Sequence, residues 1–269
     1  MNKQNPIIKK IKKFVKNFFR KRNIEFYRRA KKKRILEAIS LTKPFDLGHS
    51  LIRVGGEGDG GYLLPDILDG IKYCFSPGVG LISEFESQLK NREIKSFLAD
   101  FTVDAPAAED LFKFEKKFIK SYNSENSITF DDWIMNSVNP TDKDFLVQMD
   151  IEGSEYEVIN SISNFNLEKI KIMVIEFHHL QFLTNDVFLE NYISVFRKLK
   201  NYFEINHIHP NNCCGVTIVD DLVIPNVLEV TFLNKKYVQR KNQIIHLPNS
   251  LDKKNVEKKK DIKLSYHWF

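Results

Sequence analysis

Residues 145–159 read FLVQMDIEGSEYEVI, and this stretch decides the fold that we expect. The apolar run 145–149 is typical of a buried strand, and the segment 154–162 indicates a helix. A strand that leads directly into a helix is the repeating unit of a parallel sheet covered by helices. Four acidic residues stand where the strand leaves the core: Asp150, Glu152, Glu155 and Glu157. Open parallel sheets bind ligands beyond the carboxyl ends of their strands, so these carboxylates are candidates for a site.

The same alternation of strands and helices continues along the chain from residue 50. Strands are predicted at 71–76, 95–100, 127–130, 144–150, 169–177, 202–209 and 227–233. Helices are predicted at 83–91, 107–122, 154–162 and 185–201. This order favours an α/β fold with a parallel sheet covered on both faces. Because the last two strands lack a long helix between them, we expect them to be antiparallel neighbours.

The bulk composition limits the class of protein. A chain of 269 residues that is 42% hydrophobic fits one domain with a terminal extension. It has no apolar run of about 18 residues and no signal-peptide segment, so no transmembrane helix is expected. The three cysteines, Cys74, Cys213 and Cys214, have no metal-binding spacing, and so few are typical of a reducing compartment. We therefore expect a cytoplasmic protein, with the inner-membrane surface as a further place of contact.

The net charge of +6 conceals a segregation of charge. Residues 1–34 hold 15 Lys and Arg against one acid, whereas residues 35–250 hold 20 against 31, a net charge of −11. From residue 251 the chain is basic again, with six Lys against three acids. An acidic body argues against a nucleic-acid partner. We divide the chain into a basic helical extension (1–45), a main domain (46–250) and a Lys-rich tail (251–269).

The N-terminal extension carries an amphipathic pattern. Its apolar residues recur with helical period: Ile7, Ile8, Ile11, Phe14, Val15, Phe18 and Phe19. Three interpretations stay open. The helix packs on its own domain or on a second subunit, it lies on an anionic membrane surface, or it is a partly ordered basic extension.

Two glycine clusters indicate where the backbone approaches a ligand. The first strong strand ends in Ser76-Pro-Gly-Val-Gly80, and the next ends in Asp100, about 20 residues later, a spacing suited to a ribose-binding carboxylate. The third glycine of the dinucleotide fingerprint is missing, which argues against a pyrophosphate-binding turn. The glycine turn and the acid together therefore favour a nucleoside cofactor. The segment 53–66, RVGGEGDGGYLLPD, leads into no helix and is interpreted as a loop over cofactor or substrate. For both clusters the alternative is an ordinary turn.

Several motifs resemble those of the FkbM-type family of S-adenosylmethionine-dependent methyltransferases. They are DIEGSEYEVI (150–159) with EFHH (176–179), RVGGEGDGGYLL (53–64), FSPGVGLISEFE (75–86) and HIHPNNC (207–213). The resemblance covers about residues 50–235. It implies the Rossmann-like class I methyltransferase fold, in which a seven-stranded, mostly parallel sheet has an antiparallel last strand.

The resemblance also implies roles for individual residues. The residues expected to bind S-adenosylmethionine are Ser76, Gly78, Gly80, Glu86, Asp100 and, near the adenine, Asp132. Those expected at the substrate are Arg53, Asp59, Tyr62, Glu152, Asn211 and Asn212. Asp150 would stand at the mouth of the site, where methyl donor and acceptor meet.

The chemistry of a hydroxyl acceptor explains acids and histidines at this rim. A sugar hydroxyl is a weak acid, so its methylation needs a base or a metal ion. The predicted catalytic residues are Asp150, Glu176, His178 and His209. Two mechanisms stay open. In one, His178 is a general base oriented by a carboxylate; in the other, Asp150, Glu176 and His178 bind a divalent metal ion.

The leading functional hypothesis is an O-methyltransferase acting on a sugar hydroxyl. The expected acceptor is a nucleotide-linked sugar or a precursor of a surface polysaccharide such as capsule or lipopolysaccharide. One alternative keeps the methyltransferase class and changes the acceptor to another small-molecule hydroxyl or a nitrogen. The other is a catalytically inactive scaffold of the same fold at a membrane surface.

Overall fold

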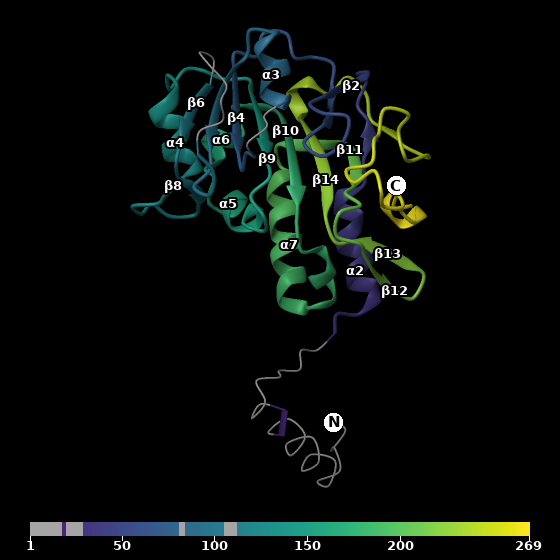
Figure 1. Cartoon of the computed structure of the whole chain (residues 1–269). Helices are drawn as coiled ribbons and strands as arrows, with labels where there is room; N and C mark the ends of the chain where they lie inside the picture. The colour runs from purple at the N-terminus through teal and green to yellow at the C-terminus, as the bar shows by residue number, and fades with distance from the viewer. Residues whose placement is uncertain (1–17, 20–28, 81–83, 105–111) are drawn as a thin grey trace.

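The computed structural model describes residues 18–19, 29–80, 84–104 and 112–269, and a seven-stranded sheet lies at its centre (Figure 1). Across the sheet the strands are β11 (Phe203–Pro210), β14 (Leu228–Asn234), β10 (Ile170–Phe177), β9 (Phe145–Met149), β4 (Tyr73–Pro77), β5 (Lys95–Ala99) and β6 (Phe112–Glu115). The pairs from β10 to β6 are parallel, and β14 is antiparallel to both of its neighbours. The predicted mostly parallel sheet with an antiparallel last strand is confirmed.

Two hydrophobic clusters cover the two faces of this sheet. One contains side chains of α2 (Lys32–Ile39), α4 (Phe130–Ser137), α5 (Glu155–Ser161), α6 (Asn164–Leu167) and α7 (Asp186–Leu199). The other contains side chains of α3 (Glu84–Lys90) and of the hairpin β2 (Leu51–Val54) and β3 (Tyr62–Pro65). Every residue of β9 and β10 is buried, as expected of strands covered on both faces. The β2–β3 hairpin thereby brings the glycine-rich loop 55–61 over the sheet.

The helix predicted at 107–122 is wrong over the part that the structure describes. Residues 112–115 form the edge strand β6, and β7 (Phe118–Lys120) pairs with β8 (Ser127–Thr129) in a separate two-stranded sheet. Residues 112–115 read FKFE, an alternation of apolar and charged residues that suits an edge strand with one face on the core. The third strand of the main sheet is therefore β6, not the predicted strand at 127–130. Residues 107–111 lie outside the described residues.

The two ends of the chain differ in what the structure describes. Of the predicted N-terminal helix, residues 1–17 and 20–28 lie outside the described residues, so its three interpretations stay predictions. The C-terminal tail packs on the domain. Trp268, in η4 (Tyr266–Trp268), is fully buried and donates its indole N–H to the Val223 carbonyl oxygen at 2.9 Å. Val223 lies in the hairpin β12 (Val216–Val219) and β13 (Leu222–Pro225).

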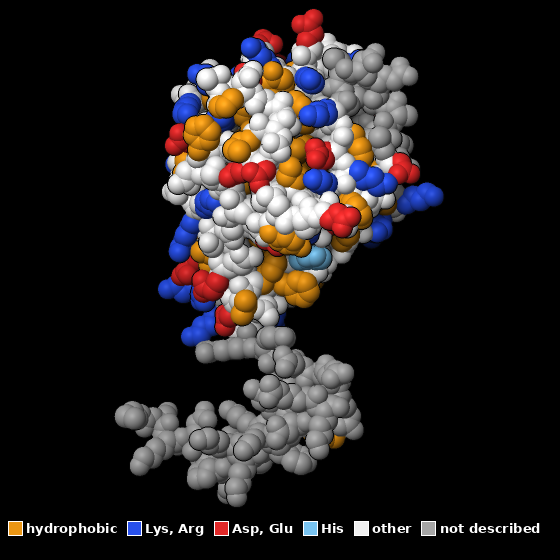
Figure 2. Space-filling view, turned by 90° about the vertical axis from the view of Figure 1, so that its left-hand side faces the viewer, with side chains coloured by type: hydrophobic (Ala, Val, Ile, Leu, Met, Phe, Trp, Pro, Cys, Tyr) orange, Lys and Arg blue, Asp and Glu red, His pale blue; other side chains and the backbone are white. Residues whose placement is uncertain are grey.

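Short elements complete the described part of the chain. They are the strand pair β1 (Phe45–Asp46) and β15 (Asn242–Gln243) and the 3-10 helices η1 (Ser40–Thr42), η2 (Leu180–Thr184) and η3 (Lys235–Tyr237). Among the described helices, none combines the length and the apolar character that crossing a bilayer requires. On the face seen in Figure 2, basic and acidic side chains are intermixed, with apolar side chains scattered between them.

Candidate functional site

A cavity of about 530 Å³ lies at the carboxyl ends of β4, β5 and β9. Among its lining are residues that the sequence singled out for the site: Asp59, Tyr62, Gly78, Gly80, Glu86, Asp100, Asp150 and Glu152. The rest of the lining is Gly60, Val79, Glu84, Phe85, Thr102, Val103 and Gln148. The loop after β4 and the turn that carries Asp150 therefore border the same cavity.

Gly78 brings these two segments into backbone contact. Its φ of +80° lies in the left-handed region, and a Cβ added there would lie 1.5 Å from the backbone oxygen of Asp150. Two backbone hydrogen bonds fix the junction. The Gly78 N–H donates to the Ala99 carbonyl oxygen at 2.9 Å, and the Asp150 N–H donates to the Pro77 carbonyl oxygen at 3.1 Å. Only glycine fits this position without displacing Asp150.

A buried polar group supports the floor of the cavity. The Ser76 hydroxyl lies between the Glu86 carboxylate and the side-chain oxygen of Gln148. The Gln148 amide N–H in turn donates to the Tyr62 hydroxyl at 3.3 Å. Burial raises the pKa of Glu86. Ser76 thus lies beneath the cavity and positions Glu86, which lines it.

The two acids predicted to meet the adenosine lie in different places. Asp100 lines the cavity, and its Oδ1 accepts hydrogen bonds from the backbone N–H and the hydroxyl of Thr102 at 2.6 and 2.7 Å. Asp132 lies in the first turn of α4, where its Oδ2 accepts from Asn123 and Thr129 at 2.6 and 2.8 Å. Thr129 caps that helix by accepting from the Asp132 N–H. Asp132 is not among the residues that line the cavity.

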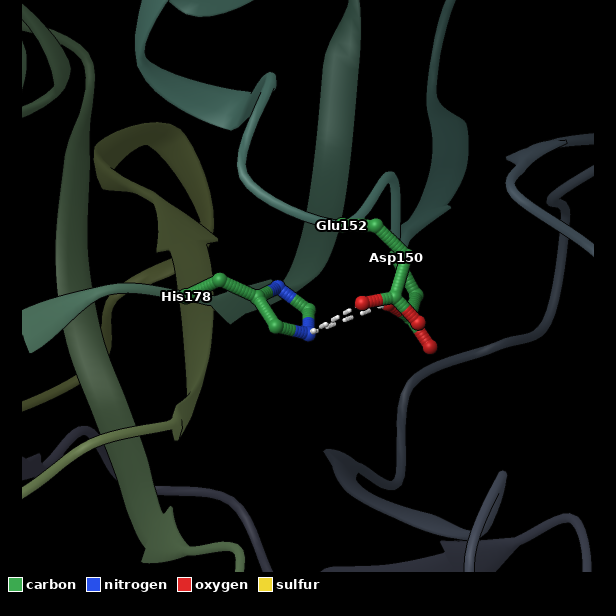
Figure 3. A group of neighbouring side chains, drawn as sticks. All are labelled: Asp150, Glu152 and His178. Carbon is green, nitrogen blue, oxygen red and sulfur yellow. Dashed lines mark ion pairs between the residues drawn. The ribbon is translucent and has the colours of Figure 1, made fainter. Parts of the chain in front are cut away.

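His178 lies beside two carboxylates that line the cavity, Asp150 and Glu152 (Figure 3), and a third carboxylate, Glu155, contacts its other ring nitrogen. His178, directly after β10, has its Nδ1 3.0 Å from Oε1 of the fully buried Glu155. Its Nε2 lies 3.4 Å from a Glu152 carboxylate oxygen and 3.8 Å from Oδ1 of Asp150. Glu152 reaches this place from a left-handed backbone conformation, with φ of +53°. Glu155 thus holds the imidazole so that Nε2 faces two carboxylates.

Burial and charge perturb this group. Burial raises the pKa of Asp150 to about 7, although the nearby His178 acts in the opposite direction. Burial also lowers the pKa of His178, but Glu155, Asp150 and Glu152 outweigh it, so that its pKa is raised. Asp150 Oδ1 is shielded from solvent and has no hydrogen-bond partner among the described residues. The group therefore has an unmet capacity to bind a proton or a metal ion.

Glu176 has other partners. Its carboxylate accepts from the Asn211 amide at 2.7 Å and lies 3.5 Å from the Tyr62 hydroxyl, whereas His178 Nε2 is 4.0 Å away. It stands opposite Glu229 in the antiparallel β10–β14 pair. Burial raises the pKa of Glu176 well above its ordinary value. The predicted metal ligands were Asp150, Glu176 and His178. The group that the structure brings together consists of Asp150, Glu152 and His178 (Figure 3), so Glu152 takes the place predicted for Glu176.

The remaining predicted residues are not among those that line the cavity. Arg53 donates to the carbonyl oxygens of Gly56 and Gly58, at 2.9 and 2.8 Å, and so shapes the glycine-rich loop. Asn212 holds the tail, since its Oδ1 accepts from the Val256 N–H at 2.8 Å. His209 lies 3.6 Å from Asp252 of the tail and lines a second cavity of about 310 Å³, between β11 and the tail.

Some residues of the site were not assigned to it from the sequence. Gln148 is the one polar residue in the apolar run 145–149, a local signal that could have found it. Glu155 was one of the four acids noted after the strand, but it was given no role of its own, and its full burial is visible only in the fold. Asp252 and Asn255 of the tail have no local signal, because their contacts join segments far apart in the sequence. Among the described residues, the group that could hold a metal ion contains no cysteine; Cys213 and Cys214 are joined by a disulfide.

A protein family and several solved structures match the chain. No curated protein matches it. The N-methyltransferase NodS from Bradyrhizobium japonicum WM9 is 10% identical, with a TM-score of 0.32, over 75% of this chain and 94% of that one. A TehB-like S-adenosylmethionine-dependent methyltransferase from Corynebacterium glutamicum is 11% identical, with a TM-score of 0.30, over 86% of this chain and 100% of that one. Residues 62–204, which are 143 of the 269 residues, match the family described as the methyltransferase FkbM domain. The chain belongs to this family.

Proposed function

We propose that the protein transfers a methyl group from S-adenosylmethionine to a hydroxyl of a sugar. The proposed acceptor is a nucleotide-linked sugar or another precursor of a surface polysaccharide. The observation that carries this proposal is that Asp150 and Glu152, which line the cavity together with Gly78, lie 3.8 and 3.4 Å from Nε2 of His178. Transfer to a hydroxyl requires removal of a proton, and this group can accept one.

The residues of the cavity fit the proposed cofactor. The charged side chains among its described lining residues are all acidic: Asp59, Glu84, Glu86, Asp100, Asp150 and Glu152. Such a lining suits a ligand with a sulfonium and an ammonium group. Gly78 and Gly80 leave room beside the turn, Glu86 would hold the amino-acid end, and Asp100 would accept from the ribose hydroxyls. When bound, S-adenosylmethionine supplies a methyl group already activated for transfer.

Proton removal is assigned to His178 and its carboxylates. Glu155 accepts a hydrogen bond from the Nδ1–H at 3.0 Å, which leaves the Nε2 lone pair on the side of Asp150 and Glu152. Asp150 and Glu152 then stabilise the imidazolium that forms when Nε2 takes the hydroxyl proton. In this route Glu155 has the orienting role, and Nε2 is the base.

A divalent cation is the other route to the same alkoxide, and we propose Asp150, Glu152 and His178 as its ligands. Their ligand atoms all lie within 4.8 Å of one another. Atoms bound at about 2.1 Å to one ion lie about 3 to 4 Å apart, which matches the separations of 3.4 and 3.8 Å from His178 Nε2. The contact between Glu155 and Nδ1 is typical of the outer-shell carboxylates that orient metal-binding histidines.

Binding of Mn²⁺ separates the two routes. If the cation route holds, electron paramagnetic resonance of the protein without substrates will detect bound Mn²⁺, and Glu152→Gln will weaken its affinity at least about tenfold through loss of a charged ligand. Glu157→Gln is the matched control, since Glu157 pairs with Lys120 outside the group. Equal affinity in the two variants, or no bound Mn²⁺, leaves His178 as the base.

The acceptor side of the cavity suits a polyol. Asp59 and Glu152 are exposed carboxylates at its rim, and carboxylates accept hydrogen bonds from sugar hydroxyls. Because the charged groups of the described lining are all acids, they would repel the phosphates of a nucleotide sugar, which would have to lie outside the cavity. We further propose that the N-terminal amphipathic segment contacts an anionic membrane or a second subunit. Flotation of the full chain with anionic and with neutral vesicles tests the membrane contact, and sedimentation tests the second subunit.

The proposed activity is tested by incubating the protein with S-adenosylmethionine and a panel of UDP-, GDP- and dTDP-sugars. Mass spectrometry will show the gain of one methylene by an acceptor, and His178→Gln will abolish it while Asp132→Asn, outside the cavity lining, retains it. Methylation of only amines or phenols in a parallel panel would redirect the proposal to those acceptors. If calorimetry detects no binding of S-adenosylmethionine or of its demethylated product, the inactive-scaffold alternative replaces it.

A further inference from the structure

Three carboxylates near the cavity share two asparagine side chains. Glu176 and Glu229 stand opposite each other on β10 and β14, and Asp59 lies above them in the glycine-rich loop. Burial raises the pKa of both glutamates. Like charges opposite each other in a sheet repel, so this arrangement needs donors between the carboxylates.

Asn211 and Asn255 are those donors. Asn211 donates to Glu176 at 2.7 Å and to Oδ1 of Asp59 at 3.3 Å. Asn255 donates to Glu229 at 2.7 Å and to the same oxygen of Asp59 at 3.2 Å. One oxygen of Asp59 is thereby held by two amides, on a residue that lines the cavity.

The tail runs alongside the glycine-rich loop. Lys253 pairs with Glu57 at 3.1 Å, and a Cβ added to Gly58 would meet the backbone oxygens of Asn255 and Lys254 at 3.4 and 3.7 Å. A loop with glycines at 55, 56, 58, 60 and 61 has little rigidity of its own, so contacts from outside must fix it.

The tail is anchored strongly enough to fix that loop. On one side of Asn255, the buried Asp252 accepts from His207 at 2.8 Å. On the other side, the Val256 N–H donates to Asn212 at 2.8 Å, and farther along Trp268 is fully buried. These anchors therefore hold Asn255 at a fixed position relative to the sheet, next to the glycine-rich loop.

We infer that the C-terminal tail is part of the acceptor site, with Asn255 as the positioning residue that aims Asp59 at the acceptor. This inference rests on the proposed function for its effect on catalysis. Because Asp59 would bind acceptor equally before and during transfer, loss of Asn255 acts on acceptor KM rather than on kcat.

Kinetics with UDP-glucose, or with whichever panel sugar is methylated best, test the inference. Asn255→Ala will raise acceptor KM about tenfold, as expected for a lost hydrogen bond to a charged group, with kcat within about twofold. Asn255→Gln, which keeps the donor, will recover part of this loss. Asn249→Ala, in the same tail, is the matched control, because its described hydrogen bonds are with Leu251 and Asp252 and not with the loop.

A double-mutant cycle separates positioning from general destabilisation. If Asn255 acts through Asp59, then Asp59→Ala combined with Asn255→Ala will raise KM no further than Asp59→Ala alone. The inference would be overturned if the KM increases of the two single variants multiply in the double variant, or if KM is unchanged in Asn255→Ala.

A measurement without acceptor keeps this test apart from the proposed function. Hydrogen exchange of the peptide 53–66 will quicken in Asn255→Ala and stay unchanged in Asn249→Ala. Unchanged exchange in Asn255→Ala would overturn the inference even if no panel sugar is methylated. Quickened exchange without methylation of any sugar would instead count against the proposed function.

Discussion

Replacement of Gly78 by alanine is the sharpest test of the geometry that joins the two halves of the site. The added Cβ would lie 1.5 Å from the Asp150 backbone oxygen and 2.4 Å from its carbonyl carbon. Because both neighbours are backbone atoms, no side-chain rotation relieves the overlap, and the Asp150 turn must move away from β4.

The expected loss of stability follows from two contributions. A left-handed alanine costs about 1 to 2 kcal/mol. Displacing Asp150 strains the bonds from Gly78 to Ala99 and from Asp150 to Pro77, and each buried backbone group left unpaired costs about 1 to 3 kcal/mol. We therefore expect Gly78→Ala to lower the free energy of unfolding by at least about 3 kcal/mol.

Gly70 provides a matched control for this variant. It has the same φ of +80°, and a Cβ added there meets no atom within 4 Å. Gly70→Ala should therefore cost only the left-handed contribution of about 1 to 2 kcal/mol. Urea unfolding followed by circular dichroism measures both variants, and calorimetry measures their affinity for S-adenosylhomocysteine. Equal losses of stability, with unchanged affinity in Gly78→Ala, would refute the close approach of Gly78 to Asp150.

Three further predictions concern the tail and its anchor. Burial lowers the pKa of His209, but Asp252 and Glu229 outweigh it and raise the pKa to about 9. The raised pKa of His209 therefore stabilises the fold fully below the unfolded pKa of about 6.5, and this stabilisation is lost as the pH rises through about 9. It amounts to at most about 3 kcal/mol. In urea unfolding measured across this pH range, His209→Gln should lack this pH-dependent contribution. Asp252→Ala leaves two buried histidines without their carboxylate and should cost about 3 to 5 kcal/mol at pH 7 in the same assay. Trp268→Ala should lower the free energy of unfolding by about 3 to 5 kcal/mol, and a loss below about 1 kcal/mol would show that the tail is dispensable for stability.

The sequence predicts the strands of this fold well where both faces are buried. The apolar runs that become β9 and β10 are continuous, and their bounds lie within a residue of those predicted. The edge of the sheet is harder, because FKFE in β6 is short and its neighbours EDLFKFEKKF also fit a helical period. Pairing with β5 decides between the two, and that pairing is a tertiary contact with no local signal.

The same distinction holds at the site. Gly78, Asp100 and Asp150 can be predicted because each lies at or just beyond the end of a strand, where topology alone brings residues to one edge. Asn255 cannot be predicted, since it lies 196 residues from Asp59 in the sequence. Asp132 follows a strand-like segment too, but that segment pairs with β7 outside the main sheet, so Asp132 lies in the first turn of α4 and not at the cavity.

Glu176 and Asp150 show how partners sort carboxylates that the sequence cannot tell apart. Both stand at or just beyond the end of a strand at the same edge of the sheet, and Glu176 lies two residues before His178 in the sequence. In the fold, Asn211 and Tyr62 satisfy Glu176, whereas Asp150 Oδ1 has no hydrogen-bond partner among the described residues. A carboxylate with its partners in place costs little to keep buried, and one without them is costly unless a proton, a cation or a substrate hydroxyl completes it. Because of that difference we assign proton removal or cation binding to Asp150 and its neighbours, and support of the glycine-rich loop to Glu176.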